Sequence, residues 1–160
     1  MKPVYLFPNK LKIPALIVFI ISIILIALQF SNISIEINTK VFALISDPFL
    51  DRENTGKFIW IKQDMYNEVL DTLFFSSGLI LAFSKEKIDD EMITLIRYKS
   101  LTITTYFIFI TLIISEFLIY GMSFGYVIMF FNYMFILLLN IIYYTKLYIY
   151  KKQFSHENED

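Results

Sequence analysis

Residues 13–30 read IPALIVFIISIILIALQF, an apolar run that contains no charged side chain. The hydrocarbon core of a bilayer is about 30 Å thick, so a helix that crosses it needs roughly 20 mainly apolar residues. Comparable runs occupy residues 65–83, 101–120 and 124–150. Since backbone groups in lipid must be hydrogen-bonded within their own segment, each run is expected to be a helix. The sequence therefore predicts an all-α membrane protein of four transmembrane helices in one membrane domain, residues 1–160.

The composition agrees with this class. The chain has 160 residues, of which 57% are hydrophobic and 18% charged, whereas charged residues make up about a quarter of an ordinary soluble domain. A net charge of -1 offers no global basic field to attract nucleic acid. The chain has no cysteine, which excludes disulfides and thiolate metal sites. The first run is longer than a signal peptide's apolar region and no A-x-A site follows it, so it is expected to be retained.

Basic residues indicate the orientation, because cytoplasmic loops of membrane proteins carry an excess of Lys and Arg. Ten of them fall in the segment before the first run, in the link 84–100 and around the tail 151–160, whereas the loop 31–64 has only four. The first group is Lys2, Lys10, Lys12, Lys85, Lys87, Arg97, Lys99, Lys146, Lys151 and Lys152. Both ends are therefore predicted to be cytoplasmic. Tyrosines 143, 144, 148 and 150 are expected to anchor the last helix at the headgroups.

The loop 31–64 is the only sizeable segment predicted outside the membrane on the other face. Apolar and polar residues alternate over residues 33–41, and residues 57–62 form a second β-prone stretch, with turn-forming residues between them. A small β-hairpin on the outer membrane face is expected. Because two strands alone are marginally stable in water, they must pack on something else. The hairpin is either a simple cover for helix ends or a sensing or docking surface. Asp64 is a candidate cap for the next helix.

The link SKEKIDDEMITLIRYKS, residues 84–100, is the densest cluster of charges. Its spacing predicts an amphipathic helix at the inner interface. A solvated connector and a docking site for a cytoplasmic protein partner both fit this pattern. A divalent metal fits less well, because no His or rigid turn completes a ligand set. The candidate docking residues are Glu86, Asp89, Asp90, Glu91 and Arg97.

Several stretches resemble a family of uncharacterised small four-helix inner-membrane proteins of Bacteroidetes-type bacteria. They are SKEKIDDEMI at 84–93, LIR at 95–97, SL at 100–101, YLFP at 5–8, YG at 120–121 with Phe124, and MFFNYMF at 129–135. The family signature reads closer to Ser-x-Glu-Lys-x-Glu-Asp-Glu, and Ile88-Asp89 here keeps the charge of its x-Glu pair. The resemblance runs through most of the chain. It implies a multi-pass protein of the bacterial inner membrane and carries no mechanism.

Two acidic residues fall inside predicted helices, Asp71 about two turns and Glu116 about one turn from the outer end. A charged Asp at a helix centre costs about 2.5–3.5 kcal/mol on insertion scales. Because helices 65–83 and 101–120 run antiparallel, the two carboxyls are expected at similar shallow depth, where neighbouring carboxylates would share a proton. With Glu68 and Asn132 nearby they form a candidate intramembrane polar site. The alternative is that both carboxylates extend to the outer interface.

Other polar residues fit helix packing. Ser76-Ser77-Gly78 is a small-residue patch that a neighbouring helix can approach, and hydroxyls at 104, 111 and 115 share one helix face. The sequence contains no Ser/His/Asp set, phosphate loop or metal-ligand spacing, so no enzyme activity, metal or cofactor is expected. The favoured function is an accessory or regulatory membrane protein that acts through protein contacts. The alternative is a small ion, proton or solute transporter that uses the acidic residues near the outer face.

Overall fold

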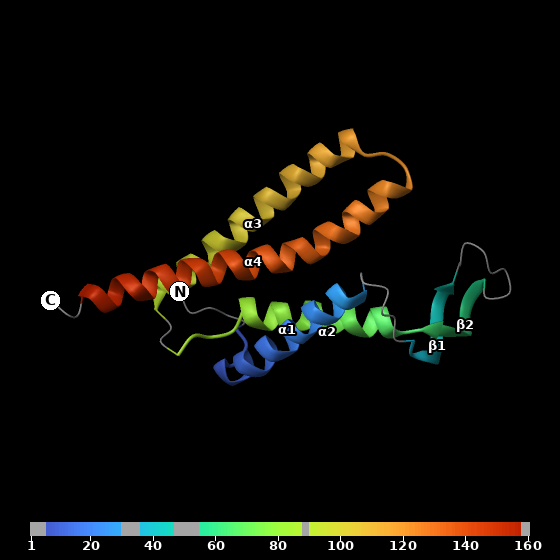
Figure 1. Ribbon diagram of the computed structural model, residues 1–160, viewed down its shortest axis with the longest axis horizontal. Coiled ribbons are helices and arrows are strands. Elements are labelled where there is room, and N and C mark those ends of the chain that lie inside the picture. Colours follow the sequence, from blue (N-terminus) through green and yellow to red (C-terminus); the bar gives the residue numbers. More distant parts are fainter. Residues whose placement is uncertain (1–5, 30–35, 47–54, 88–89, 158–160) are drawn as a thin grey trace. The chain divides into compact units, whose positions relative to one another are not determined.

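The computed structural model describes residues 6–29, 36–46, 55–87 and 90–157 (Figure 1). Within these residues the chain forms four α-helices, one short 3-10 turn (Asn9–Leu11) and one two-stranded sheet. The elements are α1 (Lys12–Gln29), β1 (Asn38–Ser46), β2 (Gly56–Asp64), α2 (Tyr66–Ala82), α3 (Glu91–Leu118) and α4 (Met122–Glu157). They fall into two compact units, Met1–Ile20 with Phe75–Asp160 and Ile21–Phe74, which are described separately.

Among the described residues, three helical stretches have the length and apolar character needed to cross a membrane. They are Asn9–Gln29, which joins the 3-10 turn to α1, then Glu91–Leu118 and Met122–Gln153. The described part of the chain is thus mostly helical, and these three stretches support the prediction of a membrane protein. All four predicted helices are present in the described residues, but α2 has only 17 residues, which at 1.5 Å per residue is about 26 Å. A fourth crossing by α2 stays a prediction.

Helix α3 begins earlier than the sequence pattern indicated. A separate interfacial helix was expected over 84–100, followed by a transmembrane helix from 101, but one helix runs unbroken from Glu91 to Leu118. The reason is a continuous buried stripe, at Ile93, Arg97, Ser100, Thr104 and Ile108, whose spacing of three to four residues passes through position 101 without a break. The charges of the link therefore lie partly on the first turns of a long helix.

Helices α3 and α4 form an antiparallel pair joined by a tight turn (Figure 1). Gly121 in this turn has a φ of 72°, a left-handed conformation that glycine adopts without steric cost. The helices diverge towards the turn and converge at their other ends (Figure 1). The converging ends enclose a buried apolar cluster of Ile93, Ile96, Tyr143 and Leu147. This apolar cluster thus lies beside the charged link.

A polar side chain holds α4 against α2. The Nδ2 group of Asn140 donates to the carbonyl of Gly78, 3.1 Å away, and to that of Ile136 at 2.9 Å. Ser77 and Gly78 are buried at this contact. The small-residue patch predicted in this helix therefore does lie where another helix approaches closely.

The second unit contains the β-hairpin. Strands β1 and β2 pair antiparallel, with Phe42 opposite Trp60 and Val41 opposite Ile61. The predicted hairpin is confirmed, although β1 extends to Ser46, beyond the alternating stretch that suggested it, and residues 33–35 lie outside the described part. Asp64 ends the hairpin and accepts hydrogen bonds from the backbone N–H groups of Ile37 (2.8 Å) and Tyr66 (3.1 Å). This carboxylate therefore caps the start of α2, as expected.

Candidate functional site

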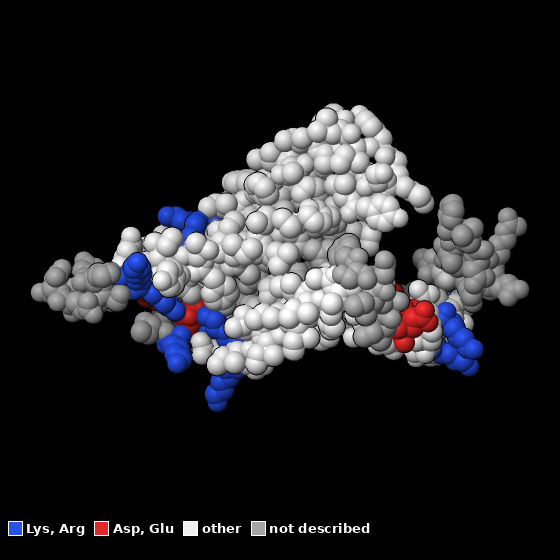
Figure 2. Space-filling model, in the orientation of Figure 1, with Lys and Arg blue, Asp and Glu red and all other residues white. Residues whose placement is uncertain are grey.

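The most distinctive polar feature of the first unit is a buried carboxylate between two lysines. Glu86 lies between α2 and α3, and only 5% of its side chain is exposed. Its Oε1 accepts from Lys12 Nζ at the start of α1, and its Oε2 from Lys151 Nζ near the end of α4, 3.2 Å away. The carboxylate thus joins segments that are 74 and 65 residues distant in sequence. On the face shown in Figure 2, charged side chains of this unit gather near the C-terminal end of α4.

The pKa of Glu86 reflects two opposing effects. Burial raises the pKa of its carboxyl, because the charged form loses water. The hydrogen bonds and positive charges of Lys12 and Lys151 lower it, and together they prevail, so the pKa lies below its ordinary value of 4.5. Glu86 is therefore ionised at neutral pH and contributes a fixed negative charge to this end of the bundle.

Arg97 on α3 is the second buried charge, with 6% of its surface exposed. Its Nη2 donates to the carbonyl of Ser84 (3.0 Å) and to the hydroxyl of Tyr143 (3.2 Å), and its guanidinium lies 5.4 Å from the Tyr143 ring centroid. Its Nε and Nη1 atoms have no hydrogen-bond partner among the described residues. Arg97 therefore makes its hydrogen bonds through Nη2, and the three N–H groups on Nε and Nη1 of this buried cation have no acceptor among the described residues.

Tyr143 on α4 connects these two charges. Its hydroxyl accepts from Arg97 and donates to Glu86 Oε1, 3.2 Å away, and its ring is 1% exposed. A hydroxyl can do both because it has one proton and two lone pairs. The ring also packs against that of Tyr144, at 5.1 Å between centroids. The group of Lys12, Glu86, Arg97, Tyr143 and Lys151 is called the charge cluster below.

Backbone pairing fixes the segment that carries Glu86. The N–H of Phe7 donates to the carbonyl of Phe83, and the N–H of Lys85 donates to the carbonyl of Phe7, both at 2.9 Å. Asn9 Nδ2 donates to the carbonyl of Lys85 at 2.7 Å. The residues before α1 therefore pair with the residues after α2 as a short parallel bridge. This leaves the Glu86 carboxylate little freedom to leave the charge cluster.

The other end of the segment is fixed by Asp90. Its Oδ1 accepts from the backbone N–H of Ile93, 2.7 Å away, which makes Asp90 the N-cap of α3. Its Oδ2 accepts from the hydroxyl of Tyr150 on α4 at 2.8 Å. The Asp90 carboxylate therefore caps the N-terminus of α3 and also links α3 to α4 through the hydrogen bond with Tyr150.

The candidate docking residues divide by exposure. Glu86 and Arg97 are buried in the charge cluster, Asp90 is half-buried, and Glu91 is exposed on the first turn of α3. Asp89 lies outside the described residues. The first two side chains point into the protein because their partners lie on α1 and α4, which the spacing within 84–100 cannot indicate. The charged side chains of this segment that a partner could contact are therefore exposed ones such as Lys85, Lys87 and Glu91.

The candidate intramembrane residues belong to both units. Asp71, which is half-buried, and Glu68, which is exposed, lie on α2 within the second unit, whereas Glu116 and Asn132 are exposed on α3 and α4 of the first. Glu68 borders a hollow of about 210 Å³ with Met65, Val69, Thr72 and Leu73. A shared proton between Asp71 and Glu116 stays a prediction.

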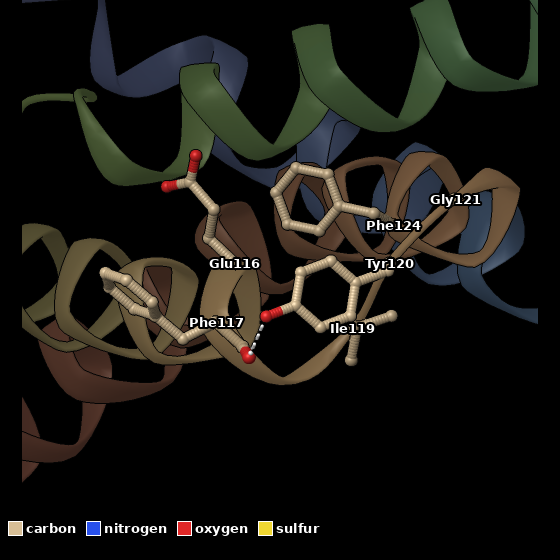
Figure 3. Close-up of a pocket in the computed structure, with 6 residues that line it drawn as sticks. All are labelled: Glu116, Phe117, Ile119, Tyr120, Gly121 and Phe124. Atoms are coloured by element: carbon tan, nitrogen blue, oxygen red, sulfur yellow. Dashed lines mark hydrogen bonds between the residues drawn. The ribbon is translucent and has the colours of Figure 1, made fainter.

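Glu116 borders a larger hollow beside the turn between α3 and α4 (Figure 3). Its volume is about 590 Å³, and its wall is mainly apolar. The hydroxyl of Tyr120 donates to the carbonyl of Phe117 at 2.8 Å, and the Glu116 carboxylate extends away from that bond (Figure 3). The other lining residues are Ile119, Gly121 and Phe124. Glu116 is thus the one carboxylate among the residues that line this hollow.

Sequence patterns did not identify the charge cluster as a unit. From the sequence, Lys12 and Lys151 indicated only the orientation of the chain, and Tyr143 only an anchor at the membrane interface. In the structure Tyr143 is buried, whereas Tyr148 is 69% exposed, as an interfacial ring would be. The signal available in the sequence was a Tyr and a Lys at helical spacing on α4, which alone does not indicate a partner for Glu86.

No grouping of three His, Asp or Glu side chains able to hold a metal ion occurs in the described ranges. Comparisons with profiles of known protein families, with curated proteins and with solved structures each gave no match to this chain.

Proposed function

We propose that this chain is an accessory or regulatory protein of a bacterial inner membrane that acts through protein contacts and not by catalysis. In this proposal it crosses the bilayer four times and both ends are cytoplasmic. The distribution of basic residues supports the orientation. The resemblance of residues 84–93 to small inner-membrane proteins of Bacteroidetes-type bacteria supports the location.

The observation that carries the proposal is the anchoring of two short stretches, residues 83–87 and residues 90–91. The parallel bridge to Phe7 and the Glu86 ion pairs hold the first stretch, and the Asp90 cap holds the second at the start of α3. Their exposed side chains, which include Lys85, Lys87 and Glu91, are therefore presented on a preorganised surface. Preorganisation favours binding because little conformational entropy is lost when the partner arrives. A solvated connector has no need of such anchoring.

The first turns of α3 extend this surface. Glu91, Met92, Leu95 and Tyr98 follow one another at helical spacing and all are exposed, with Met92 at 48% and Leu95 at 41%. Apolar side chains bordered by charges are typical of a protein interface, where the apolar centre supplies affinity and the charged rim selects the partner. Residues 85, 87, 91, 92, 95 and 98 are called the docking face.

The proposal is tested by crosslinking in native membranes. A photo-reactive phenylalanine analogue at Leu95 is expected to give an adduct of defined mass. The same analogue at Ile113, which lies further along α3 and is 53% exposed, is expected to give none. Glu91→Lys should weaken the adduct at Leu95. Equal labelling at both sites, or labelling unaffected by Glu91→Lys, would contradict the docking face. Reporter fusions at the two ends test the orientation, which fails if they report opposite compartments.

A second candidate function is favoured by the position of Glu116. Its carboxylate borders the hollow at the α3–α4 turn, and an ionisable group in a membrane helix is a site for an ion or proton pathway. In this alternative the chain is a small transporter that uses Asp71 and Glu116, with Glu68 and Asn132 as further polar groups. Asp71→Asn and Glu116→Gln should then each reduce ion flux in proteoliposomes. Wild-type flux in both variants would exclude it.

A further inference from the structure

One face of the β-hairpin carries large apolar side chains that nothing in the described structure covers. Phe42 and Leu44 of β1 and Phe58 and Trp60 of β2 are between 49% and 71% exposed. The rings form one cluster, with Phe42 lying 5.4 Å from Trp60 and 6.4 Å from Phe58 between centroids. These four residues are called the aromatic face. The opposite face has no aromatic ring: Val41, Ala43, Ile59 and Ile61 are half-buried there, and Ile45 is exposed.

The backbone of β2 is strained where it presents one of these rings. Phe58 has a φ of 56°, although it is not glycine, and such a conformation costs of order 1–3 kcal/mol for an ordinary residue. Phe58 lies between the paired positions Ala43–Ile59 and Ile45–Lys57. A bulky aromatic residue at a position suited to glycine or asparagine indicates that the ring itself is needed on this face.

Two lysines lie at the base of the aromatic face. Lys40 and Lys62 are directly opposite each other in the strand pair, and by the alternation of side chains they share the face of Phe42 and Trp60. Like charges directly opposite each other destabilise a pair of strands. Neither ammonium has an ion-pair partner among the described residues, and the nearby Asp64 accepts from backbone N–H groups instead. An anion between the two lysines would remove this repulsion.

We infer that the aromatic face docks on the lipid bilayer, in the leaflet at which α1 ends and α2 begins. Phe42, Phe58 and Trp60 enter the boundary between headgroups and acyl chains, where aromatic rings are favoured. Lys40 and Lys62 lie on either side of a lipid phosphate. Binding of this kind combines buried apolar area with attraction to anionic headgroups. It also explains how a hairpin of two strands, marginal in water, is maintained.

The charge pattern favours lipid over a second copy of the chain. Two hairpins stacked through their aromatic faces would bring the lysines of both copies together, while the Asp64 carboxylate already accepts from backbone N–H groups. A phosphate headgroup supplies the missing negative charge and is abundant at this depth of the membrane. This inference concerns the hairpin alone and does not depend on the docking face of α3.

Trp60 allows a direct test, because it is the only tryptophan in the chain. The full-length protein is reconstituted in vesicles of phosphatidylcholine, with or without phosphatidylglycerol. We expect the emission of Trp60 to be blue-shifted, quenched by lipids brominated close to the headgroup, and protected from iodide. Emission that iodide quenches as readily as in the denatured chain, with no effect of brominated lipid, would overturn the inference.

The lysine pair is tested by Lys40→Gln with Lys62→Gln. At about 1 kcal/mol for each basic residue near an anionic surface, the ratio of docked to undocked hairpin should fall roughly fivefold per lysine in phosphatidylglycerol vesicles. Lys57→Gln is the matched control, because Lys57 is exposed but lies opposite Ile45 on the other face. An equal loss in the control would contradict the phosphate contact. Protection of Trp60 that disappears as lipid is added at constant protein would assign the face to a second copy and overturn the inference.

Discussion

Gly78 of α2 packs directly against Ile136 of α4. A methyl group built on Gly78 would overlap Cγ2 of Ile136 and lie 2.9 Å from Cε2 of Phe19 on α1. The two helices can therefore approach only because this position has no side chain. Gly125, also helical, has open space where a Cβ atom would lie. It therefore serves as a control for substitution of Gly78.

We predict that Gly78→Ala lowers the free energy of unfolding by about 1–3 kcal/mol, the usual cost of overpacking. Gly125→Ala should be neutral or stabilising by up to about 1 kcal/mol, because alanine is the better helix former. Unfolding in detergent, followed by circular dichroism, measures both. In the double variant Gly78→Ala with Ile136→Ala, the two losses should be less than additive. Equal effects of the two glycine substitutions would show that the close approach is not a constraint.

Glu86→Gln is predicted to destabilise the protein by about 2 kcal/mol at neutral pH. The substitution leaves Lys12 and Lys151 without their counter-charge, and the loss is smaller than for a fully buried pair because Lys151 is 55% exposed. Glu91→Gln, on an exposed residue of the same segment, should change stability by less than about 0.5 kcal/mol. The comparison is made by denaturant unfolding in micelles. A similar loss for both variants would mean that the ion pairs contribute nothing specific.

Glu86 also predicts how stability depends on pH. Its pKa in the folded protein is below 4.5, so the unfolded chain binds its proton more readily. The contribution of this carboxylate is fully present above pH 4.5 and is lost as the pH falls through the lower folded value. The difference in melting temperature between wild type and Glu86→Gln should therefore shrink on acidification. A difference that stays constant down to about pH 3 would contradict this assignment.

Asp90 and Tyr150 allow the cap of α3 to be separated from its link to α4. Asp90→Ala removes both, and the lost N-cap alone should cost about 1 kcal/mol. Tyr150→Phe removes only the hydroxyl and should cost about 0.5–1.5 kcal/mol, because it leaves the cap in place. Hydrogen exchange of amides 91–94 distinguishes the two, since only Asp90→Ala should expose them. Faster exchange in Tyr150→Phe would show that the link, and not the cap, maintains the helix start.

The strained Phe58 gives a prediction with opposite signs for two properties. Phe58→Gly should slow hydrogen exchange of the hairpin in micelles, because glycine adopts a positive φ without strain. In vesicles the same variant should increase iodide quenching of Trp60, because an anchoring ring is lost. Phe42→Gly is the control, since it removes a ring from an unstrained position. It should reduce both the protection of the hairpin from hydrogen exchange and the protection of Trp60 from iodide. If hydrogen exchange of the hairpin in micelles were slower in both variants, the role of strain at Phe58 would be contradicted.

Local patterns in the sequence predicted much of the fold. The apolar runs predicted four helices, with boundaries close to those observed for α1 and α2. The reason is that bilayer thickness sets the length of a helix that spans it. Alternation indicated the hairpin, and Ser77-Gly78 indicated a close helix contact. The start of α3 was placed ten residues late, at 101 instead of Glu91, because dense charge suggested a boundary that the buried stripe of the helix does not have.

The charge cluster could not be predicted for a physical reason. Glu86 and Arg97 look like exposed charges when only their neighbours in sequence are considered. Their burial depends on Lys12, Lys151 and Tyr143, which other helices bring to them. Pairing across 46 to 74 residues leaves no periodic trace in a single sequence. That Glu86 and Arg97, two of the candidate docking residues, are buried could therefore be recognised only in three dimensions.

The pairing of Glu86 also has a consequence for biogenesis. During translation Lys12 emerges first, Glu86 follows, and Lys151 arrives only when α4 is nearly complete. Until then the carboxylate has one of its two cations, and Arg97 lacks the hydroxyl of Tyr143. A nascent chain that stops before the last helix therefore leaves Glu86 and Arg97 without partners that they have in the complete chain.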